Sequence, residues 1–306
     1  MKRIYTIAII ILCSIATVSA QKLNVGSYNI RYDNKDDSVK GNGWKQRCPV
    51  ICELIQFHDF DIFGSQEVLD HQLKDMLSGL PSYNYIGVGR DDGATKGEYA
   101  PIFYKKDKFN LLKSGVFWLS TTTDHPNVGW DAVLPRICTW GEFEEKESGL
   151  RFWFFNLHMD HVGVEARKES AKMVLNMIKE QCGTEPVIFT GDFNVDQTNE
   201  SYALINDSGI LKDSYEVTKM RYAENGTFNG FKTDNKTSSR IDHIFVSPTF
   251  DVLRYGILTD TYRSPIAESN EEIKSGNFPK EVSLHKYMAR TPSDHFPVMV
   301  VLEYKK

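Results

Sequence analysis

Residues 187–196 read VIFTGDFNVD, and this stretch indicates both the fold and a candidate site. Its first four residues, 187–190, are apolar or β-branched and predict a buried strand. The strand runs into a glycine, after which Asp192, Asn194 and Asp196 alternate with apolar residues. A buried strand that ends in an acid and an amide is typical of sheets whose strand ends supply side chains to a shared crevice.

The rest of the chain alternates between strand and helix patterns. The other predicted strands cover residues 22–30, 61–68, 83–90, 100–106, 111–120, 136–145, 150–158, 240–247 and 296–304. Predicted helices cover residues 44–60, 69–80, 165–180 and 201–209, and Pro49 is expected to break or start the first of them. Because nothing resembles a linker or a repeat, we predict one α/β domain. We expect this domain to be a four-layered α/β sandwich, with two mixed β-sheets packed face to face and helices outside.

Two segments are expected to lie around the sheets rather than in them. Residues 95–115 predict a hairpin region that borders a cleft, and residues 260–292 are polar and irregular. We interpret the second segment as a long surface loop, which in a compact domain is often functional or mobile.

The N-terminus carries a targeting pattern. Lys2 and Arg3 precede a short apolar run, and Val18 and Ala20 occupy the −3 and −1 positions of a cleavage site. We therefore predict a signal peptide at residues 1–20, a mature domain at residues 21–306, and export to the periplasm or beyond the cell. The alternative is an uncleaved anchor. No second hydrophobic span follows, so no stable membrane span is expected after cleavage.

Composition limits the possible partners. The chain has 306 residues, 41% of them hydrophobic, which is enough for a large core. Its formal charge is −5, and cleavage would remove two cationic residues to give −7. Such a surface does not attract nucleic acid non-specifically, because that attraction requires lysine and arginine to neutralise phosphates. The spacing of Cys48, Cys52, Cys138 and Cys182 makes a zinc site improbable, and it leaves any disulfide pairing open.

Acids, amides and histidines recur where predicted strands end or begin. These positions are Asn29, Glu67, Asn156, His158, Asp192, Asn194, Asp242, Asp294 and His295. Carboxylates that converge repel one another unless a cation neutralises them. A hard cation with oxygen ligands suits this set, and we expect Mg²⁺, with Mn²⁺ as a substitute.

The order of these motifs, N…QE…NLH…GDFN…D…SDH, resembles the endonuclease/exonuclease/phosphatase superfamily from Asn29 to Val301. That fold is shared by secreted deoxyribonucleases, apurinic endonucleases, sphingomyelinases, inositol phosphatases and deadenylase-like enzymes. The run GVGRDDG…GEYAPIFY…FWLS…GWDA…RICTW is similar to the bacterial branch near the deadenylase-like members. The resemblance implies that Glu67 is the main Mg²⁺ ligand, with Asn29 beside it and Asp294 completing the metal site.

The resemblance also implies catalytic roles. Asp192 would orient and deprotonate the attacking water, and Asn194, on the same face of an extended segment, would hold the phosphate or that water. His295 would donate to a non-bridging phosphate oxygen. Asp242 would either orient a histidine or hold a second ion, and His158 would either contact the phosphate or protonate the leaving group.

Four further residues are candidates for substrate binding. Arg136 can clamp a phosphate bidentately or form a salt bridge at the rim, and Trp130 can stack on a base or a sugar or simply pack. Arg31 and Asn156 lie at motif ends.

Three functions remain open at this point. The first is an exported, Mg²⁺-dependent phosphoesterase in which water attacks a phosphodiester or phosphomonoester in line. The second is a secreted nuclease on DNA or RNA, for which the sequence offers few basic stretches. The third is a non-catalytic module that binds a phosphate ligand on the same fold. The partner is thus a phosphate ester, either a small molecule or a nucleic acid, and the default oligomeric state is a monomer.

Overall fold

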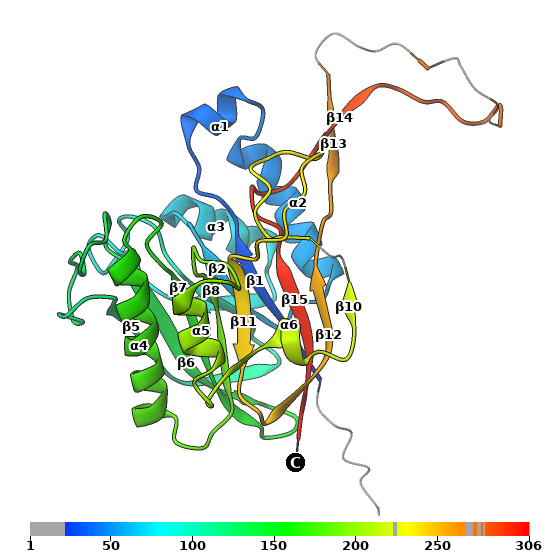
Figure 1. The fold of residues 1–306 in the computed structure, drawn as a ribbon. Helices are drawn as coiled ribbons and strands as arrows, with labels where there is room; N and C mark the ends of the chain where they lie inside the picture. The colour runs from blue at the N-terminus through cyan, green and yellow to red at the C-terminus, as the bar shows by residue number, and fades with distance from the viewer. Residues whose placement is uncertain (1–21, 223–224, 267–271, 274–276, 278, 306) are drawn as a thin grey trace, which may run out of the picture.

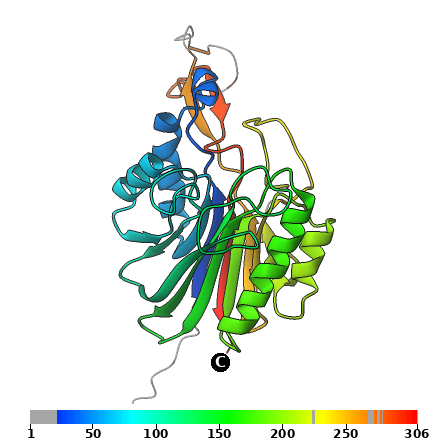
Figure 2. The same ribbon diagram turned by 90° about the vertical axis from the view of Figure 1, so that its left-hand side faces the viewer.

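The structure is a computed structural model that describes residues 22–222, 225–266, 272–273, 277 and 279–305. The predicted signal peptide at residues 1–20 lies outside these residues. Two large sheets face each other and are flanked by helices (Figures 1 and 2). This confirms the predicted α/β sandwich.

The first sheet has seven strands in the order β10-β12-β15-β1-β2-β4-β3. These strands are β1 Lys22–Asn29, β2 Ile62–Gln66, β3 Tyr83–Ile86, β4 Ile102–Lys105, β10 Arg221–Tyr222, β12 Phe250–Ile257 and β15 Val298–Tyr304. β1 pairs in parallel with β2 and antiparallel with β15, so the sheet is mixed.

The second sheet has six strands in the order β5-β6-β7-β8-β11-β9. These are β5 Phe109–Trp118, β6 Ile137–Glu145, β7 Arg151–His158, β8 Val187–Asp192, β9 Lys212–Asp213 and β11 Asp242–Val246. β7 and β8 are parallel and β11 is antiparallel to β8, so this sheet is mixed as well.

Three apolar layers account for the sandwich. Between the sheets, residues such as Val25 and Phe154 pack together. Outside the first sheet lie α2 (Trp44–Phe57) and α3 (Asp70–Gly79), and outside the second lie α4 (Val164–Gln181) and α5 (Glu200–Asn206). Each helix buries one apolar face against its sheet, as their periodicity predicts. The short helices are α1 (Lys35–Val39) and α6 (Ser214–Val217).

Several local expectations were wrong. α2 continues through Pro49 from its start at Trp44. Residues 95–115 do not form a hairpin, because β4 pairs with β2 and β3 in one sheet while β5 pairs with β6 in the other. The chain therefore crosses between the sheets after β4, and the segment before β4 borders the cleft.

The segment 260–292 also differs from the expected loop. It contains an antiparallel ribbon, β13 (Tyr262–Pro265) paired with β14 (Tyr287–Arg290), which projects from the body (Figure 1). β12 was not predicted from the sequence pattern.

Among the described residues, no helix has the length and apolar character needed to span a membrane. The four cysteines of this part of the chain are free thiols: Cys48, Cys52, Cys138 and Cys182.

Candidate active site

Strand register brings the polar strand ends together. Asn29 pairs with Gln66 at the end of parallel strands β1 and β2, so Glu67 follows directly beside Asn29. In the other sheet His158 pairs with Asp192, and Asp192 pairs with Asp242 across β8 and β11. β15 is antiparallel to β1, so the segment that precedes β15, with Asp294 and His295, reaches the same edge.

Asn29 lies at the centre of the cluster. Its Nδ2 donates to Glu67 Oε1 (3.0 Å) and to Asp192 Oδ2 (2.9 Å), and it lies 3.5 Å from His295 Nε2. Its Oδ1 accepts a hydrogen bond from the Arg31 backbone N–H at 3.0 Å, which fixes the amide in this orientation. Asn29 therefore holds the two carboxylates in place. The predicted ligand role requires the Asn29 oxygen to face the cluster. In this arrangement the oxygen faces the Arg31 backbone instead.

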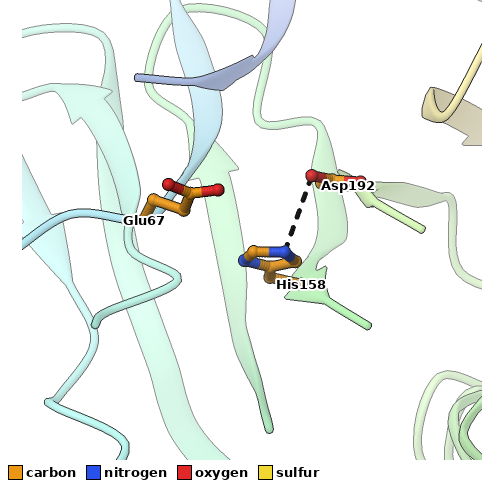
Figure 3. Close-up of side chains that lie close together, drawn as sticks. All are labelled: Glu67, His158 and Asp192. Carbon is orange, nitrogen blue, oxygen red and sulfur yellow. Dashed lines mark ion pairs between the residues drawn. The ribbon is translucent and has the colours of Figure 1, made fainter. Parts of the chain in front are cut away.

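Glu67, His158 and Asp192 point toward one another (Figure 3). One ligand atom from each lies within 4.8 Å of the others, and His158 Nε2 is 3.6 Å from Asp192 Oδ2. All three side chains are buried. Buried carboxylates at this separation repel one another, and their oxygens match the preference of a hard divalent cation. The carboxylate oxygens of Glu67 and Asp192 thus fit a divalent metal ion such as Mg²⁺.

Asp294 lies on the other side of Glu67. Arg31 Nη1 is 3.8 Å from Glu67 Oε2 and 3.7 Å from Asp294 Oδ2, so one guanidinium faces both carboxylates. Burial raises the pKa of Asp294, and the Glu67 charge adds to the rise. A cation beside Glu67 would relieve this repulsion, and the place of Asp294 in the metal site stays a prediction.

His295 forms a buried pair with Asp242. Its Nδ1 lies 2.9 Å from Asp242 Oδ2, and its Nε2 lies 3.8 Å from Asp192 Oδ2. Burial acts to lower the pKa of His295, but the carboxylates of Asp242 and Asp192 outweigh it and raise the pKa well above its ordinary value. This shift favours the protonated form of His295 near neutral pH. The contact with Nδ1 places Asp242 where it can orient the ring, and its expected role as the residue that orients a histidine stays a prediction.

For Asp192, burial and the neighbouring carboxylate act on the pKa in the same direction. Burial raises its pKa to about 7, and the charge of Asp242 adds to the rise. A carboxylate whose pKa lies near neutrality is well matched to accepting a proton from water. His158 beside it is kept neutral, because burial and then the charges of Arg136 and Arg90 lower its pKa well below the ordinary range.

Asn194 lies in the cleft but not on an extended segment. Its φ is +51°, and its backbone N–H donates to Asp192 Oδ1 at 3.0 Å, so the chain turns sharply after β8. Its Nδ2 donates to the Met159 carbonyl. The expectation of a shared strand face was wrong because Asp192 forms an Asx-type turn with its own backbone.

Arg136 is buried and almost fully held by its neighbours. Nε donates to Asp160 Oδ2 at 3.2 Å, and Nη2 lies 3.0 Å from His161 Nδ1. Nη1 has no hydrogen-bond partner among the described residues. Arg136 lines the cleft and is 4% exposed, so it is not a rim residue.

Two predicted substrate contacts do not lie in the cleft. Asn156 is fully buried between the sheets, where Oδ1 accepts from Gln66 and Thr190 and Nδ2 donates to the Ser65 and Pro101 carbonyls. All its hydrogen-bonding capacity is thus used inside the protein, so the expected contact with substrate was wrong. Trp130 is not among the residues that line the cleft.

The cleft has a volume of about 600 Å³. Its lining includes six predicted site residues besides Arg31 and Arg136, namely Glu67, His158, Asp192, Asn194, Asp294 and His295. Two further residues were not predicted from the sequence: Glu98, which lines the cleft, and Arg90, which binds it. Both lie in stretches that carried the family resemblance, GVGRDDG and GEYAPIFY, but neither follows a strand end rich in acids.

Comparisons with known proteins identify relatives of this chain. The model of the Endonuclease/Exonuclease/phosphatase family matches residues 26–295. A solved mannosyl-6-phosphatase of Bacteroides thetaiotaomicron is 56% identical, covers 92% of this chain and all of that one, and superimposes with a TM-score of 0.85. A second protein of that organism, from the same family, is 55% identical over 94% of this chain and 99% of its own, with a TM-score of 0.87.

More distant relatives share the fold. The catalytic domain of human Nocturnin, solved with a bound sulfate anion, is 19% identical over 93% of this chain and 94% of its own, with a TM-score of 0.64. The fold and the site define a phosphoric ester hydrolase. The chain belongs to the endonuclease/exonuclease/phosphatase family, whose enzymes generally depend on a divalent metal.

Proposed function

We propose that this protein is an Mg²⁺-dependent phosphatase that releases phosphate from a small phosphomonoester of the sugar-phosphate type. The observation that carries the proposal is the meeting of Glu67, Asp192 and His295 in one cleft of about 600 Å³. The likeness to a mannosyl-6-phosphatase, at 56% identity, favours a monoester over a diester.

The charges around the cleft support a phosphate monoester, which carries close to two negative charges at neutral pH. Arg31 and Arg136 line the cleft, and His295 is held in its protonated form by Asp242. A divalent ion on Glu67 would add the remaining positive charge, and when bound it would lower the pKa of a coordinated water and polarise the phosphoryl group. Since Arg31, Arg136 and His295 each already pair with a carboxylate, they would donate hydrogen bonds to the phosphate, and the bound ion would supply the net positive charge that a dianion needs.

Each residue of the site has its own role in the proposed reaction. Asp192, whose pKa is raised to about 7, accepts the proton of the attacking water. As the water oxygen bonds to phosphorus, the bond from phosphorus to the ester oxygen breaks, and the alcohol leaves with that electron pair and takes a proton from solvent. His295 donates a hydrogen bond to a non-bridging oxygen of the phosphoryl group as charge increases there, and Asp242 keeps its ring oriented. Asn194 lines the same cleft, where its side chain is fixed by the Met159 carbonyl.

We also propose that the enzyme is exported. The support for this is the signal-peptide pattern of residues 1–20 alone.

A substrate panel tests the proposed function. Purified protein comprising residues 21–306 would be assayed for phosphate release with Mg²⁺ and with EDTA. The panel would contain mannose 6-phosphate, p-nitrophenyl phosphate, bis-p-nitrophenyl phosphate, sphingomyelin and single-stranded nucleic acid. The proposal predicts Mg²⁺-dependent turnover of the two monoesters and little of the rest. Faster turnover of the diesters or of nucleic acid would contradict it. Binding of phosphate without any turnover would indicate a binding module instead.

A further inference from the structure

Glu98 is a carboxylate in the cleft that the proposed chemistry does not use. It lines the cleft with Glu67 and Asp192, and its side chain is 17% exposed. Arg90 binds it bidentately, with Nη1 donating to Oε2 at 2.8 Å and Nη2 donating to Oε1 at 3.0 Å. Both carboxylate oxygens therefore accept hydrogen bonds, and the arginine compensates the charge that a metal ion would otherwise neutralise.

The loop that carries Glu98 restricts the position of its side chain. The Arg90 N–H donates to the Glu98 carbonyl at 3.1 Å, and Trp118 Nε1 donates to the Arg90 carbonyl at 2.8 Å. Between them Gly97 has a φ of +78°, and a Cβ there would lie 2.5 Å from Asp91. Because its position is fixed before any ligand arrives, Glu98 is a preorganised acceptor.

Charge decides which part of a substrate Glu98 faces. A carboxylate repels the phosphoryl oxygens, so the phosphoryl group belongs with Arg31 and His295 and not with Glu98. Glu98 Oε2 lies 3.7 Å from His158 Nδ1, on the side of the imidazole away from Asp192, because the other ring nitrogen faces Asp192. The part of the substrate beside Glu98 is thus the leaving group.

A fixed acceptor requires a donor in that leaving group. An ionised carboxylate has about four lone-pair sites, and Arg90 occupies two of them. The rest are left for a ligand, and burying them against a purely hydrocarbon group would cost free energy. Hydroxyl groups of a sugar satisfy them.

We infer that Glu98 determines specificity by accepting a hydrogen bond from a hydroxyl of a polyhydroxylated leaving group, such as the hexose of a sugar phosphate. This inference rests on the proposed phosphatase function. It assigns Glu98 to recognition of the alcohol rather than of the phosphate, and Arg90 to the positioning of Glu98.

Two monoesters that share an alkoxide leaving group test the inference. The leaving group of mannose 6-phosphate carries free hydroxyls, whereas that of n-hexyl phosphate is an alkyl chain without any. The wild-type enzyme should prefer the sugar ester in kcat/KM by about tenfold or more, since a hydrogen bond to a charged group contributes roughly that factor. Glu98→Gln should lose about that factor on mannose 6-phosphate and change by less than about threefold on n-hexyl phosphate.

A matched control makes the same chemical change away from the cleft. Glu200 pairs with Lys168 at the surface and is not among the residues that line the cleft, so Glu200→Gln should leave the preference unchanged. An equal loss on both esters in Glu98→Gln would overturn the inference, because Glu98 would then act on the phosphate or through His158. No loss on either ester would also overturn it.

The wild-type comparison keeps the test independent of variant folding. Turnover of both esters without a preference for the sugar ester would overturn the inference while leaving the proposed function intact. Turnover of neither ester would overturn the proposed function, and the inference with it.

Discussion

At the scale of single residues, the ionisation of the site is set by immediate neighbours. Asp192 has a pKa of about 7 because it is buried beside Asp242, while His295 stays protonated because the same Asp242 bonds to its Nδ1. One carboxylate thus tunes both the proton acceptor and the hydrogen-bond donor of the proposed reaction. Sequence alone identified all three residues, because each lies at or beside a strand end.

Asp242→Asn tests this coupling. Loss of the Asp242 charge should lower the pKa of His295, so the activity that needs protonated His295 should be lost at a lower pH than in the wild type. We expect kcat at neutral pH to fall by about 10²-fold, as when a transition-state donor is misplaced. The pH–rate profile is the measurement.

The matched control is Asp251→Asn. Asp251 pairs with Lys219 and Lys305 at the surface of β12, so this variant should keep the wild-type profile. An Asp242→Asn enzyme with an unshifted profile would contradict the assigned role.

Glu67→Gln tests the metal site without an activity assay. Mg²⁺ that binds the folded state should raise the free energy of unfolding of the wild-type protein by about 2.7 kcal/mol at 100 times Kd. The Tm should rise with it. Without the Glu67 charge, the Mg²⁺ concentration that gives half the Tm shift should rise by about tenfold or more. Thermal unfolding in MgCl₂, with NaCl at equal ionic strength as the control, measures it. Equal shifts in both proteins would show that the cation binds elsewhere.

At the scale of elements, the site depends on a contact between the two sheets. Gly64 on β2 lies against β7 and β8, where a Cβ would lie 2.2 Å from Asn156 Oδ1 and 2.3 Å from Thr190 Oγ1. Asn156 there bonds to Gln66 of the first sheet. The sequence could predict that Asn156 ends a strand, but not that it faces the other sheet, because inter-sheet packing is not encoded in strand periodicity.

Gly64→Ala should therefore separate the sheets beneath the site. We expect a loss of about 1–3 kcal/mol in the free energy of unfolding, as for other overpacked cores. We also expect a fall in kcat, because Asn29 and Glu67 come from one sheet and Asp192 from the other. Urea unfolding and phosphatase assays check this. Gly256→Ala on β12, where a Cβ makes ordinary contacts, is the control and should affect neither measurement much.

A buried charge network ties β9 and β11 to α5. Asp213 Oδ2 accepts from Arg240 Nη1 at 2.6 Å and from the Tyr202 hydroxyl at 2.9 Å. Burial acts to raise the pKa of Asp213, but the contacts with His243 and Arg240 outweigh it and hold the pKa far below its ordinary value. The stability that Asp213 contributes is thus present above its unfolded pKa of about 3.9 and is lost as pH falls toward the folded value.

Asp213→Asn should reveal this contribution. At pH 7 we expect the variant to be less stable by about 3 kcal/mol, because Arg240 is left buried without its counter-charge. The difference from wild type should shrink as pH falls below about 4. Urea unfolding from pH 3 to pH 7 measures it. A difference that is constant across this range would contradict the assigned charge state.

At the scale of the whole molecule, three apolar layers between four layers of structure hold two mixed sheets together. The alternation of strand and helix patterns was enough to predict this architecture. The crossing of the chain between β4 and β5, and the place of Glu98 in the cleft, were not predictable, because both depend on which strands pair across long sequence separations.

The central claim is that one cleft binds both a divalent cation and a phosphate monoester. A crystal structure of Asp192→Asn soaked with Mg²⁺ and mannose 6-phosphate tests it most directly. The account predicts the cation on Glu67, the phosphoryl group against His295 and Arg31, and the hexose beside Glu98. A phosphoryl group bound outside this cleft, or a cation that does not contact Glu67, would contradict it.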